Sequence, residues 1–151
     1  MICQTETTRA EATVKLAERL GKNLRGGEVL ELASDLGGGK TTFVRGLARG
    51  FGSEDNVASP TFTVSKVYKA GKKELHHFDF YRLADAGILA HELHDLVGDP
   101  EIVVVVEWAE VAHHVLPDRR LTLKIARTGE DSRQLTFEYP EELAYLLEGV
   151  C

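Results

Sequence analysis

A glycine-rich turn followed by lysine and threonine is the part of this chain best suited to chemistry. Three glycines at residues 37–39 follow an apolar segment at residues 29–32, and Lys40 and Thr41 then open an amphipathic stretch. Small residues let successive backbone N–H groups curl around a phosphate, and a helix N-terminus adds the positive end of its dipole. Lys40 would then reach the outer phosphates of a nucleotide, and the Thr41 hydroxyl would bind Mg²⁺.

This turn departs from the strict phosphate-loop pattern at one position. The pattern G-x-x-x-x-G-K-[ST] has glycine where this chain has Ser34. A Cβ there restricts positive φ, so we expect Ser34 to reduce backbone freedom. The alternative is an ordinary strand–turn–helix with a solvated Lys40. The strand before the turn, the helix after it and the adjacent glycines favour nucleotide binding.

Two acidic residues follow apolar runs that read as strands. Glu107 ends the four valines at residues 103–106, and Asp79 ends the segment at residues 75–78. Ligands of open α/β sheets lie beyond the carboxyl ends of the strands, so both acids would face the phosphates. There they could hold Mg²⁺ or orient an attacking water. Solvated acids at strand ends are the alternative interpretation.

Other polar residues have less specific patterns. Thr61, in a Ser-Pro-Thr sequence before the next strand, is either a sensor of the γ-phosphate or part of a proline turn. His91 and His94 share a predicted helix face, but no further ligands accompany them, and surface histidines are favoured over a metal site. Arg45 and Arg82 are possible internal cations, although neither spacing requires that role.

The elements that must position these residues alternate between helices and strands. Thr8 and Glu11 form a capping box that predicts an N-terminal helix. The pattern then predicts strands at 29–32, 61–69, 74–81, 101–108, 121–126 and 133–139. It also predicts a helix after the glycine turn that ends at Gly50 and Gly52, further helices at 85–97 and 110–115, and a closing helix with Pro140 in its first position. Two of the strand pairs read as hairpins, so the sequence predicts an α/β sandwich with a mixed sheet.

Length, charge and cysteine content restrict the class of protein. A chain of 151 residues without a linker or repeat is expected to form one domain. The net charge of −6 argues against unaided nucleic-acid binding, which needs a basic surface. Without a signal peptide or an apolar run of membrane-spanning length, we expect a cytoplasmic protein. In a reducing cytosol, Cys3 and Cys151 are expected to be free thiols rather than a bridge between the termini.

Four segments in the chain resemble, in the same order, the bacterial TsaE family of small P-loop ATPases: ASDLGGGKTTFVRGLARGFG, VASPTFTVSKVY, HHFDFYRLAD and VVVVEWAE. The resemblance covers roughly residues 8–117, and HFDFYRL and VEW are more specific than the phosphate loop. It implies a three-layer P-loop NTPase-type sandwich with a mixed central sheet, and ATP and Mg²⁺ as cofactors. Where the family usually reads G-D-L-G-A-G-K-T, this chain has Ser34 for the first glycine and Gly38 for the alanine.

The resemblance also assigns site residues. It implies Mg²⁺ ligands at Thr41 and Glu107, a sensor at Thr61 and a second functional acid at Asp79, and the family tryptophan corresponds to Trp108. The nucleotide contacts implied by the loop, together with a basic residue found near the nucleotide in similar proteins, are Asp35, Leu36, Gly37, Gly38, Gly39, Lys40, Thr41, Thr42 and Arg133. The segment at residues 9–13 would border the adenine.

The function implied by the resemblance is support of tRNA threonylcarbamoylation at the adenosine beside the anticodon. The protein would join a TsaB–TsaD pair, contact tRNA only through these partners, and hydrolyse ATP to reset the complex between turnovers. No obvious arginine finger is present, so we expect slow turnover alone and stimulation by a partner. Two rivals stay open, namely a nucleotide-switched binding module with negligible hydrolysis and a small-molecule kinase.

Overall fold

The computed structural model describes residues 1–34, 39–58, 65–81, 83–84 and 87–151. The described residues place seven strands in one sheet, in the order β1-β7-β6-β2-β5-β4-β3. In chain order the elements are β1 (Ile2–Thr7), α1 (Ala10–Asn23), β2 (Val29–Ala33), α2 (Lys40–Phe51), β3 (Ser65–Ala70), β4 (Lys73–Asp79), α3 (Ile88–Leu96), β5 (Ile102–Glu107), the 3₁₀-helix η1 (Ala109–Val115), β6 (Leu121–Arg127), β7 (Arg133–Glu138) and the 3₁₀-helix η2 (Glu141–Leu147).

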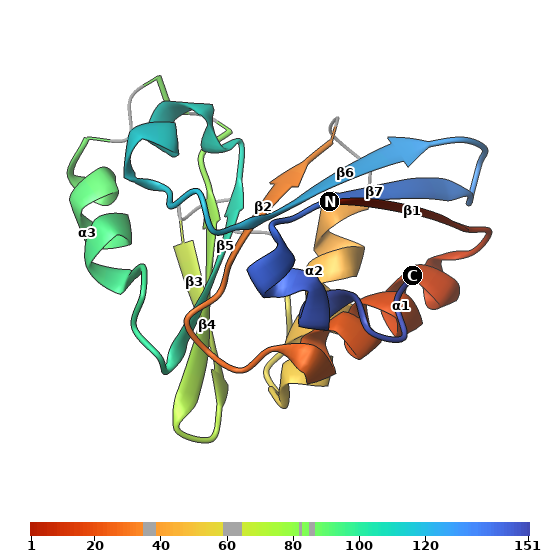
Figure 1. The fold of residues 1–151 in the computed structure, drawn as a ribbon, viewed down its shortest axis with the longest axis horizontal. Helices are drawn as coiled ribbons and strands as arrows, with labels where there is room; N and C mark the ends of the chain where they lie inside the picture. Colours follow the sequence, from red (N-terminus) through yellow and green to blue (C-terminus); the bar gives the residue numbers. More distant parts are fainter. Residues whose placement is uncertain (35–38, 59–64, 82, 85–86) are drawn as a thin grey trace.

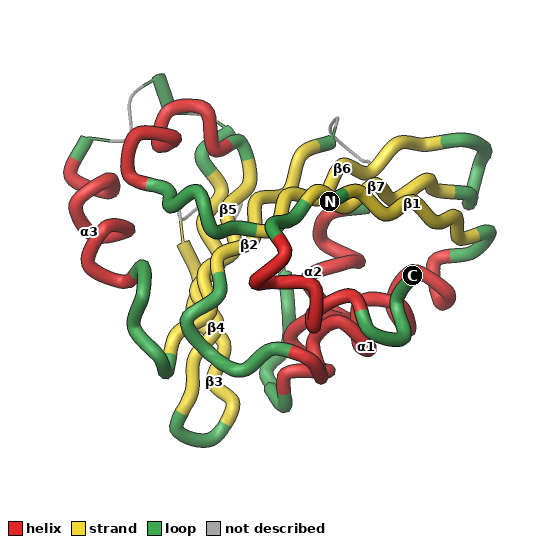
Figure 2. Tube along the Cα trace, viewed as in Figure 1, coloured by secondary structure: helices red, strands yellow, loops and turns green. Residues whose placement is uncertain are grey.

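The sheet is mixed, and helices lie on both of its faces (Figure 1). Strand β2 runs parallel to β5 and β6, and β4 runs parallel to β5. The pairs β3–β4, β6–β7 and β1–β7 are antiparallel. Figure 2 shows α1 and α2 on one side of the strands and α3 on the other. The predicted mixed α/β sandwich is therefore confirmed. No helix within the described ranges is both long and apolar enough to cross a membrane.

Strand β5 shows why the layers hold together. Val103 and Val105 pack with residues of α1, α2 and η2, while Val104 and Val106 pack with α3 and η1 on the other face. All four are buried, as the uninterrupted valine run predicts. Each fully buried valine contributes about 1.5–3 kcal/mol relative to an exposed one.

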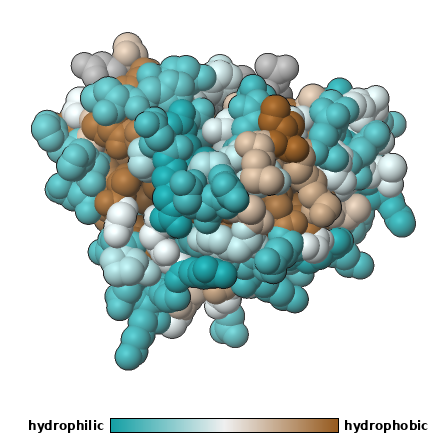
Figure 3. Space-filling model, viewed as in Figure 1, coloured by the Kyte–Doolittle hydropathy of each residue, from teal (hydrophilic) through white to brown (hydrophobic). Residues whose placement is uncertain are grey.

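Figure 3, which is viewed as Figure 1 is, shows a mostly hydrophilic surface, with hydrophobic residues gathered on the α3 side and around the N-terminus.

The structure corrects the expected start of α1. The helix begins at Ala10 with Arg9 at the N-cap, and no side chain caps it, so the predicted box of Thr8 and Glu11 is wrong. The preceding residues form β1, an edge strand that the sequence analysis missed, and its last residue pairs with Arg133 of β7. Strand β1 has no apolar alternation in its sequence, because two of the three residues on its inward face, Thr5 and Thr7, are polar.

Three other helix predictions change in detail. Gly50 lies within α2, and only Gly52 ends the helix, at a left-handed φ of 109°. The short helix predicted near residue 110 is the 3₁₀-helix η1. The closing helix is the 3₁₀-helix η2, and Pro140 is its N-cap rather than its first helical residue. The predicted strand at 61–69 is described only from Ser65 onward.

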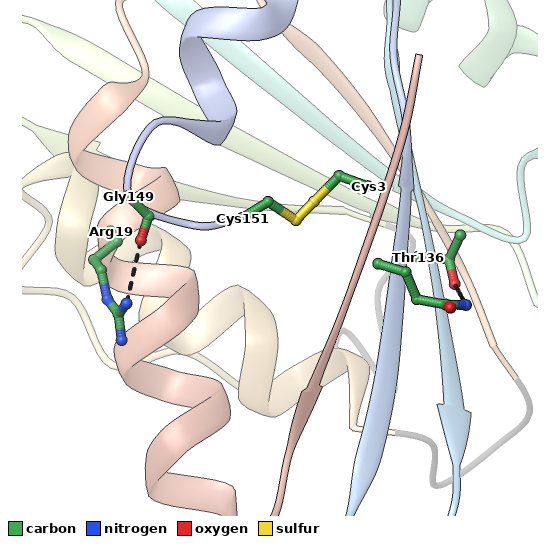
Figure 4. The surroundings of a disulfide bond; sticks show 6 residues. Cys3, Arg19, Thr136, Gly149 and Cys151 are labelled. Carbon is green, nitrogen blue, oxygen red and sulfur yellow. Dashed lines mark hydrogen bonds between the residues drawn. A yellow bond between two sulfur atoms is a disulfide. The ribbon is translucent and has the colours of Figure 1, made fainter.

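The expectation of two free thiols is also wrong. Cys3 of β1 and Cys151 at the end of the chain form a disulfide, with Cα atoms 6.3 Å apart (Figure 4). The two ends meet because β1 lies beside β7, while the C-terminal segment runs along α1, where Arg19 Nη1 donates to Gly149 O at 3.2 Å. A bridge between residues 148 positions apart follows from this arrangement and not from local sequence.

A buried carboxylate ties η2 to the start of β2. Glu28 is 2% exposed and accepts hydrogen bonds from the backbone N–H of Arg25 at 2.8 Å and of Gly26 at 2.7 Å. The Tyr145 hydroxyl also donates to it at 2.7 Å. Burial, followed by the bond to Glu28, raises the pKa of Tyr145 to about 12. The charge of Glu28 is therefore stabilised by three donors.

We expect Tyr145 to titrate near pH 12 rather than at its ordinary value of 10.0. Because the folded pKa is the higher one, the stabilisation from this neutral hydroxyl is complete below pH 10 and is lost as the pH rises through about 12. The measurement is the ultraviolet absorbance of tyrosinate, taken as the difference between wild type and Tyr145→Phe. Tyr139→Phe serves as the control. A difference curve centred near pH 10 would contradict the assignment.

Candidate phosphate-binding site

Three strands deliver the candidate residues to one edge of the sheet. In the strand register, Glu107 at the end of β5 lies opposite Leu32 of β2 and Asp79 of β4. Ser34 follows β2 directly, and α2 begins at Lys40. The parallel strands end together, so residues from three distant segments meet at the N-terminus of α2, as expected for a ligand site of an α/β sheet.

Gly39 is the N-cap of α2 and takes a conformation that suits glycine. Its φ of 102° and ψ of 17° are left-handed, and no side chain caps the helix. The first-turn N–H groups therefore point out from the helix end toward any bound anion. Thr41 and Thr42, both half-buried, occupy this first turn. A Cβ on Gly39 would lie 3.6 Å from Arg133 Nε, so the start of β7 borders this position.

The Lys40 side chain reaches back to the residue that follows β2. It is 7% exposed, and its Nζ donates to the carbonyl of Ser34 at 3.1 Å. The same Nζ lies 3.8 Å from Glu107 Oε1 and 4.5 Å from the centre of the Trp108 ring. An ammonium group is thus held among a carbonyl, a carboxylate and an aromatic face, all of which favour its charge.

The two acids differ in their surroundings. Glu107 is 2% exposed, and its Oε2 lies 2.7 Å from Nε2 of the fully buried His77. Asp79 is only half-buried and accepts a hydrogen bond from the Tyr81 N–H at 3.0 Å. Partial burial raises the pKa of Asp79, and the negative charge of Glu107 raises it further. Asp79 therefore holds its proton to a higher pH than an exposed aspartate.

Trp108 directly follows β5 at this end of the sheet, and its backbone is strained. Its φ is 56°, which makes it the one non-glycine residue at positive φ in the part of the chain that the structure describes. Its ring contacts Lys40 on one side and lies 5.0 Å from the Tyr81 ring, centre to centre. Strain of this kind is held in place by surrounding structure and is concentrated at functional sites. A hollow of about 490 Å³ adjoins Trp108 and Ser34, between β2, β6 and η1.

The donor chemistry of this edge suits Mg²⁺ bound together with phosphate. Mg²⁺ prefers carboxylate and hydroxyl oxygens and keeps several waters, so one or two protein ligands suffice beside a nucleotide. Glu107 and Thr41 offer such oxygens at the start of α2. Within the described ranges, no three histidine, cysteine or acidic residues are grouped to hold a metal by themselves. His91 and His94 are both exposed, as expected of surface histidines, and line a hollow of about 390 Å³ beside α3.

Several predicted residues cannot be placed. Asp35, Leu36, Gly37, Gly38 and Thr61 lie outside the described residues, as does Arg82. The structure brings together the others, which are Gly39, Lys40, Thr41, Thr42, Asp79, Glu107, Trp108 and Arg133. Arg45 is exposed on α2.

Sequence reasoning missed His77, and alternation along β4 was the signal that could have found it. It stands two residues before Asp79, so the two side chains share the face of β4 that lies toward α2.

Comparison with known proteins agrees with this geometry. The family model for "Threonylcarbamoyl adenosine biosynthesis protein TsaE" matches residues 7–135. A Bacillus subtilis protein named for tRNA threonylcarbamoyladenosine biosynthesis, TsaE, is 41% identical over 135 residues, which is 87% of this chain and 82% of the relative. Its Streptomyces coelicolor counterpart is 38% identical, over 81% of this chain and 86% of the relative.

A solved structure has a similar fold over nearly the whole chain. The crystal structure of Bacillus subtilis YdiB superposes with a TM-score of 0.80 and 34% identity, covering 99% of this chain and 94% of that one. Sequence, fold and site geometry therefore agree, and the chain belongs to the TsaE family of threonylcarbamoyladenosine biosynthesis proteins.

Proposed function

We propose that this protein is a Mg²⁺-dependent ATPase that supports threonylcarbamoylation of the adenosine beside the tRNA anticodon. Its family membership supports the role in that pathway. The observation that carries the ATPase activity is the meeting of the Lys40 ammonium and the Glu107 carboxylate, 3.8 Å apart, at the open N-terminus of α2. In this proposal ATP hydrolysis resets a TsaB–TsaD-like pair between turnovers, and tRNA is contacted only through those partners.

Different residues of the site would have different roles in phosphoryl transfer. Lys40, Gly39 and the first-turn N–H groups of α2 would hold the phosphates, and Arg133 would contact the nucleotide from β7. Thr41 and Glu107 would hold Mg²⁺, whose chemistry when bound is to neutralise phosphate charge. Asp79 would orient the attacking water, and Thr61 would respond to the γ-phosphate. Charge stabilisation of this kind supplies most of the catalysis of phosphoryl transfer.

The Lys40–Glu107 pair sets the charge balance of the site. The Lys40 ammonium is balanced by Glu107 and by the Ser34 carbonyl. A phosphate group would offer Lys40 a more highly charged partner, which would leave Glu107 Oε1 available to a metal. The sequence offers no obvious arginine finger, so we expect slow turnover alone and faster turnover with a partner.

The test is ATP turnover with and without a purified TsaB–TsaD pair, in wild type and Glu107→Ala. We expect the pair to bind and stimulate the wild type, and Glu107→Ala to lower the stimulated rate by about 100-fold or more. Glu101→Ala, which removes an exposed acid near the opposite end of β5, should behave as wild type.

Two outcomes would replace this proposal. Association with the pair under ATP, but without turnover, would identify a nucleotide-switched binding module. A phosphorylated product in a metabolite screen would identify a small-molecule kinase. Absence of both association and stimulated turnover would contradict the proposed role.

A further inference from the structure

One fully buried histidine touches the site, and no catalytic role has been assigned to it. His77 lies in β4 with 0% of its surface exposed, and its Nε2 is 2.7 Å from Glu107 Oε2. Its other ring nitrogen, Nδ1, has no hydrogen-bond partner among the described residues. Buried polar atoms are nearly always paired, so a ring with one strong bond and one unpaired nitrogen calls for a physical reason.

The hydrogen-bond pattern assigns the proton on this ring. A carboxylate only accepts hydrogen bonds, so the His77 Nε2 carries a proton and donates it to Glu107. Nδ1 has no acceptor, and a proton there would be buried without a partner. The ring therefore carries one proton, on Nε2, and this tautomer acts purely as a donor to Glu107.

This bond determines which carboxylate oxygen faces Lys40. His77 occupies Oε2, which leaves Oε1 as the oxygen 3.8 Å from the Lys40 Nζ. That separation is longer than a charge-assisted hydrogen bond, while the bond from His77 to Oε2 is short. Without the His77 bond, the Glu107 side chain is free to rotate toward Lys40 and to close a tighter pair with it.

We propose that His77 is a positioning residue that holds Glu107 away from Lys40. The geometry keeps the Lys40 ammonium exchangeable for phosphate and keeps Oε1 directed toward the N-terminus of α2. The inference rests on the proposed function, since it assigns Glu107 to the Mg²⁺ site, and it deepens that function by naming what orients Glu107. Outer residues that orient metal ligands typically change metal affinity or activity by about 10–100-fold when replaced.

A neighbouring histidine provides a matched control. His76 is adjacent in sequence but points to the opposite face of β4, where its Nε2 lies 3.2 Å from Glu74 Oε1. It is half-buried rather than fully buried. His76→Gln therefore changes the same residue type in the same strand without touching Glu107.

The experiment compares His77→Leu, His77→Gln and His76→Gln. Leucine removes the donor, whereas the glutamine side-chain amide can place an N–H near the position of the histidine Nε2. For each variant, kcat and KM are measured against Mg²⁺ concentration. Nucleotide and Mg²⁺ binding are followed separately by the fluorescence of Trp108, the single tryptophan of the chain, which contacts Lys40.

We expect His77→Leu to raise the Mg²⁺ concentration for half-maximal effect by about tenfold or more, in turnover and in fluorescence alike. His77→Gln should recover most of this loss, and His76→Gln should match wild type. A folded His77→Leu with wild-type Mg²⁺ dependence would overturn the proposal. So would a folded His77→Gln that is no better than His77→Leu.

A spectroscopic measurement on wild type keeps the proposal testable if the leucine variant does not fold. Nitrogen-15 NMR of the imidazole should show a proton bonded to Nε2 of His77 and none on Nδ1, and the opposite tautomer would overturn the proposal.

The proposed ATPase function and the positioning role of His77 can fail separately. Wild type that neither binds nor hydrolyses ATP would refute the proposed function, while an active wild type that is sensitive to Glu107→Ala but not to His77→Leu would refute only the positioning role.

Discussion

Replacing Lys40 by methionine is expected to weaken ATP binding and to lower turnover by about 10²–10³-fold. The Lys40 ammonium is a cation that the structure places at the N-terminus of α2, bonded to the Ser34 carbonyl and paired with Glu107. Methionine keeps much of the side-chain volume, so the packing against Trp108 is preserved while the charge is removed. The rate of ATP hydrolysis and the fluorescence change of Trp108 on nucleotide addition both measure the effect.

The same substitution should reduce stability as well. Among the described residues, it leaves Glu107, which is 2% exposed, with His77 as its remaining polar partner. Removing one member of a buried ion pair costs up to about 3–5 kcal/mol, because the other charge is left buried without compensation. Activities must therefore be compared at a temperature where urea denaturation shows the variant to be folded.

Lys22→Ala is the control for this prediction. Lys22 is an exposed lysine in the last turn of α1, and its removal changes net charge by the same amount. It should leave binding and turnover unchanged. If a folded Lys40→Met hydrolysed ATP as fast as wild type, the loop would not be the site of catalysis.

Gly46→Ala is expected to destabilise the fold by about 3 kcal/mol, against the direction that helix propensity predicts. Alanine in an exposed helix interior is about 0.8–1.0 kcal/mol more favourable than glycine. A Cβ on Gly46, however, would lie 2.3 Å from the Val14 carbonyl oxygen and 2.8 Å from Ala17 Cβ of α1. Relief requires α1 and α2 to separate, and overpacking of this kind typically costs about 1–3 kcal/mol and occasionally more.

This close approach is repeated along the helix pair. A Cβ on Gly50 would lie 2.1 Å from the Glu18 carbonyl oxygen, and one on Gly21 would lie 2.3 Å from that of Leu47. The backbones of α1 and α2 thus contact each other directly at three glycines. The sequence predicts Gly50 as an end of α2, but Gly50 lies within the helix and allows the two helix backbones to come into contact.

Urea denaturation measures the Gly46→Ala effect as a shift in midpoint at unchanged slope. Arg45→Ala, on the exposed side of the same helix, is the control and should change stability by no more than about 0.5 kcal/mol. A Gly46→Ala protein as stable as wild type would show that the two helices are less closely packed than described. Because α2 begins at Lys40, a separated helix pair should also weaken nucleotide binding.

Local pattern was sufficient for the framework of the site. The spacing of Gly39, Lys40 and Thr41 after an apolar strand, and the acids that end β4 and β5, are properties of short segments. Parallel strands that end at one edge then bring those segments together, so the meeting of Asp79, Glu107 and Lys40 could be predicted. The mixed sheet followed from the two hairpins in the same way.

Other features depended on residues far apart in sequence. Strand β1 lacks apolar alternation and forms because β7 offers it an edge. The bridge between Cys3 and Cys151 requires the two ends of the chain to be neighbours, which no local pattern indicates. Arg133 was predicted near the nucleotide only through family resemblance, and the structure does place it beside Gly39.

The sequence by itself therefore determined which residues stand at the phosphate loop and at the strand ends, because backbone conformation and hydrophobic period are encoded over a few residues. Only the tertiary structure decided how their charges are arranged. Lys40 is paired with Glu107, and Glu107 is held by His77, through contacts between α2, β5 and β4. Such contacts depend on strand register and on burial, which arise when distant segments pack and exclude water from the charges between them.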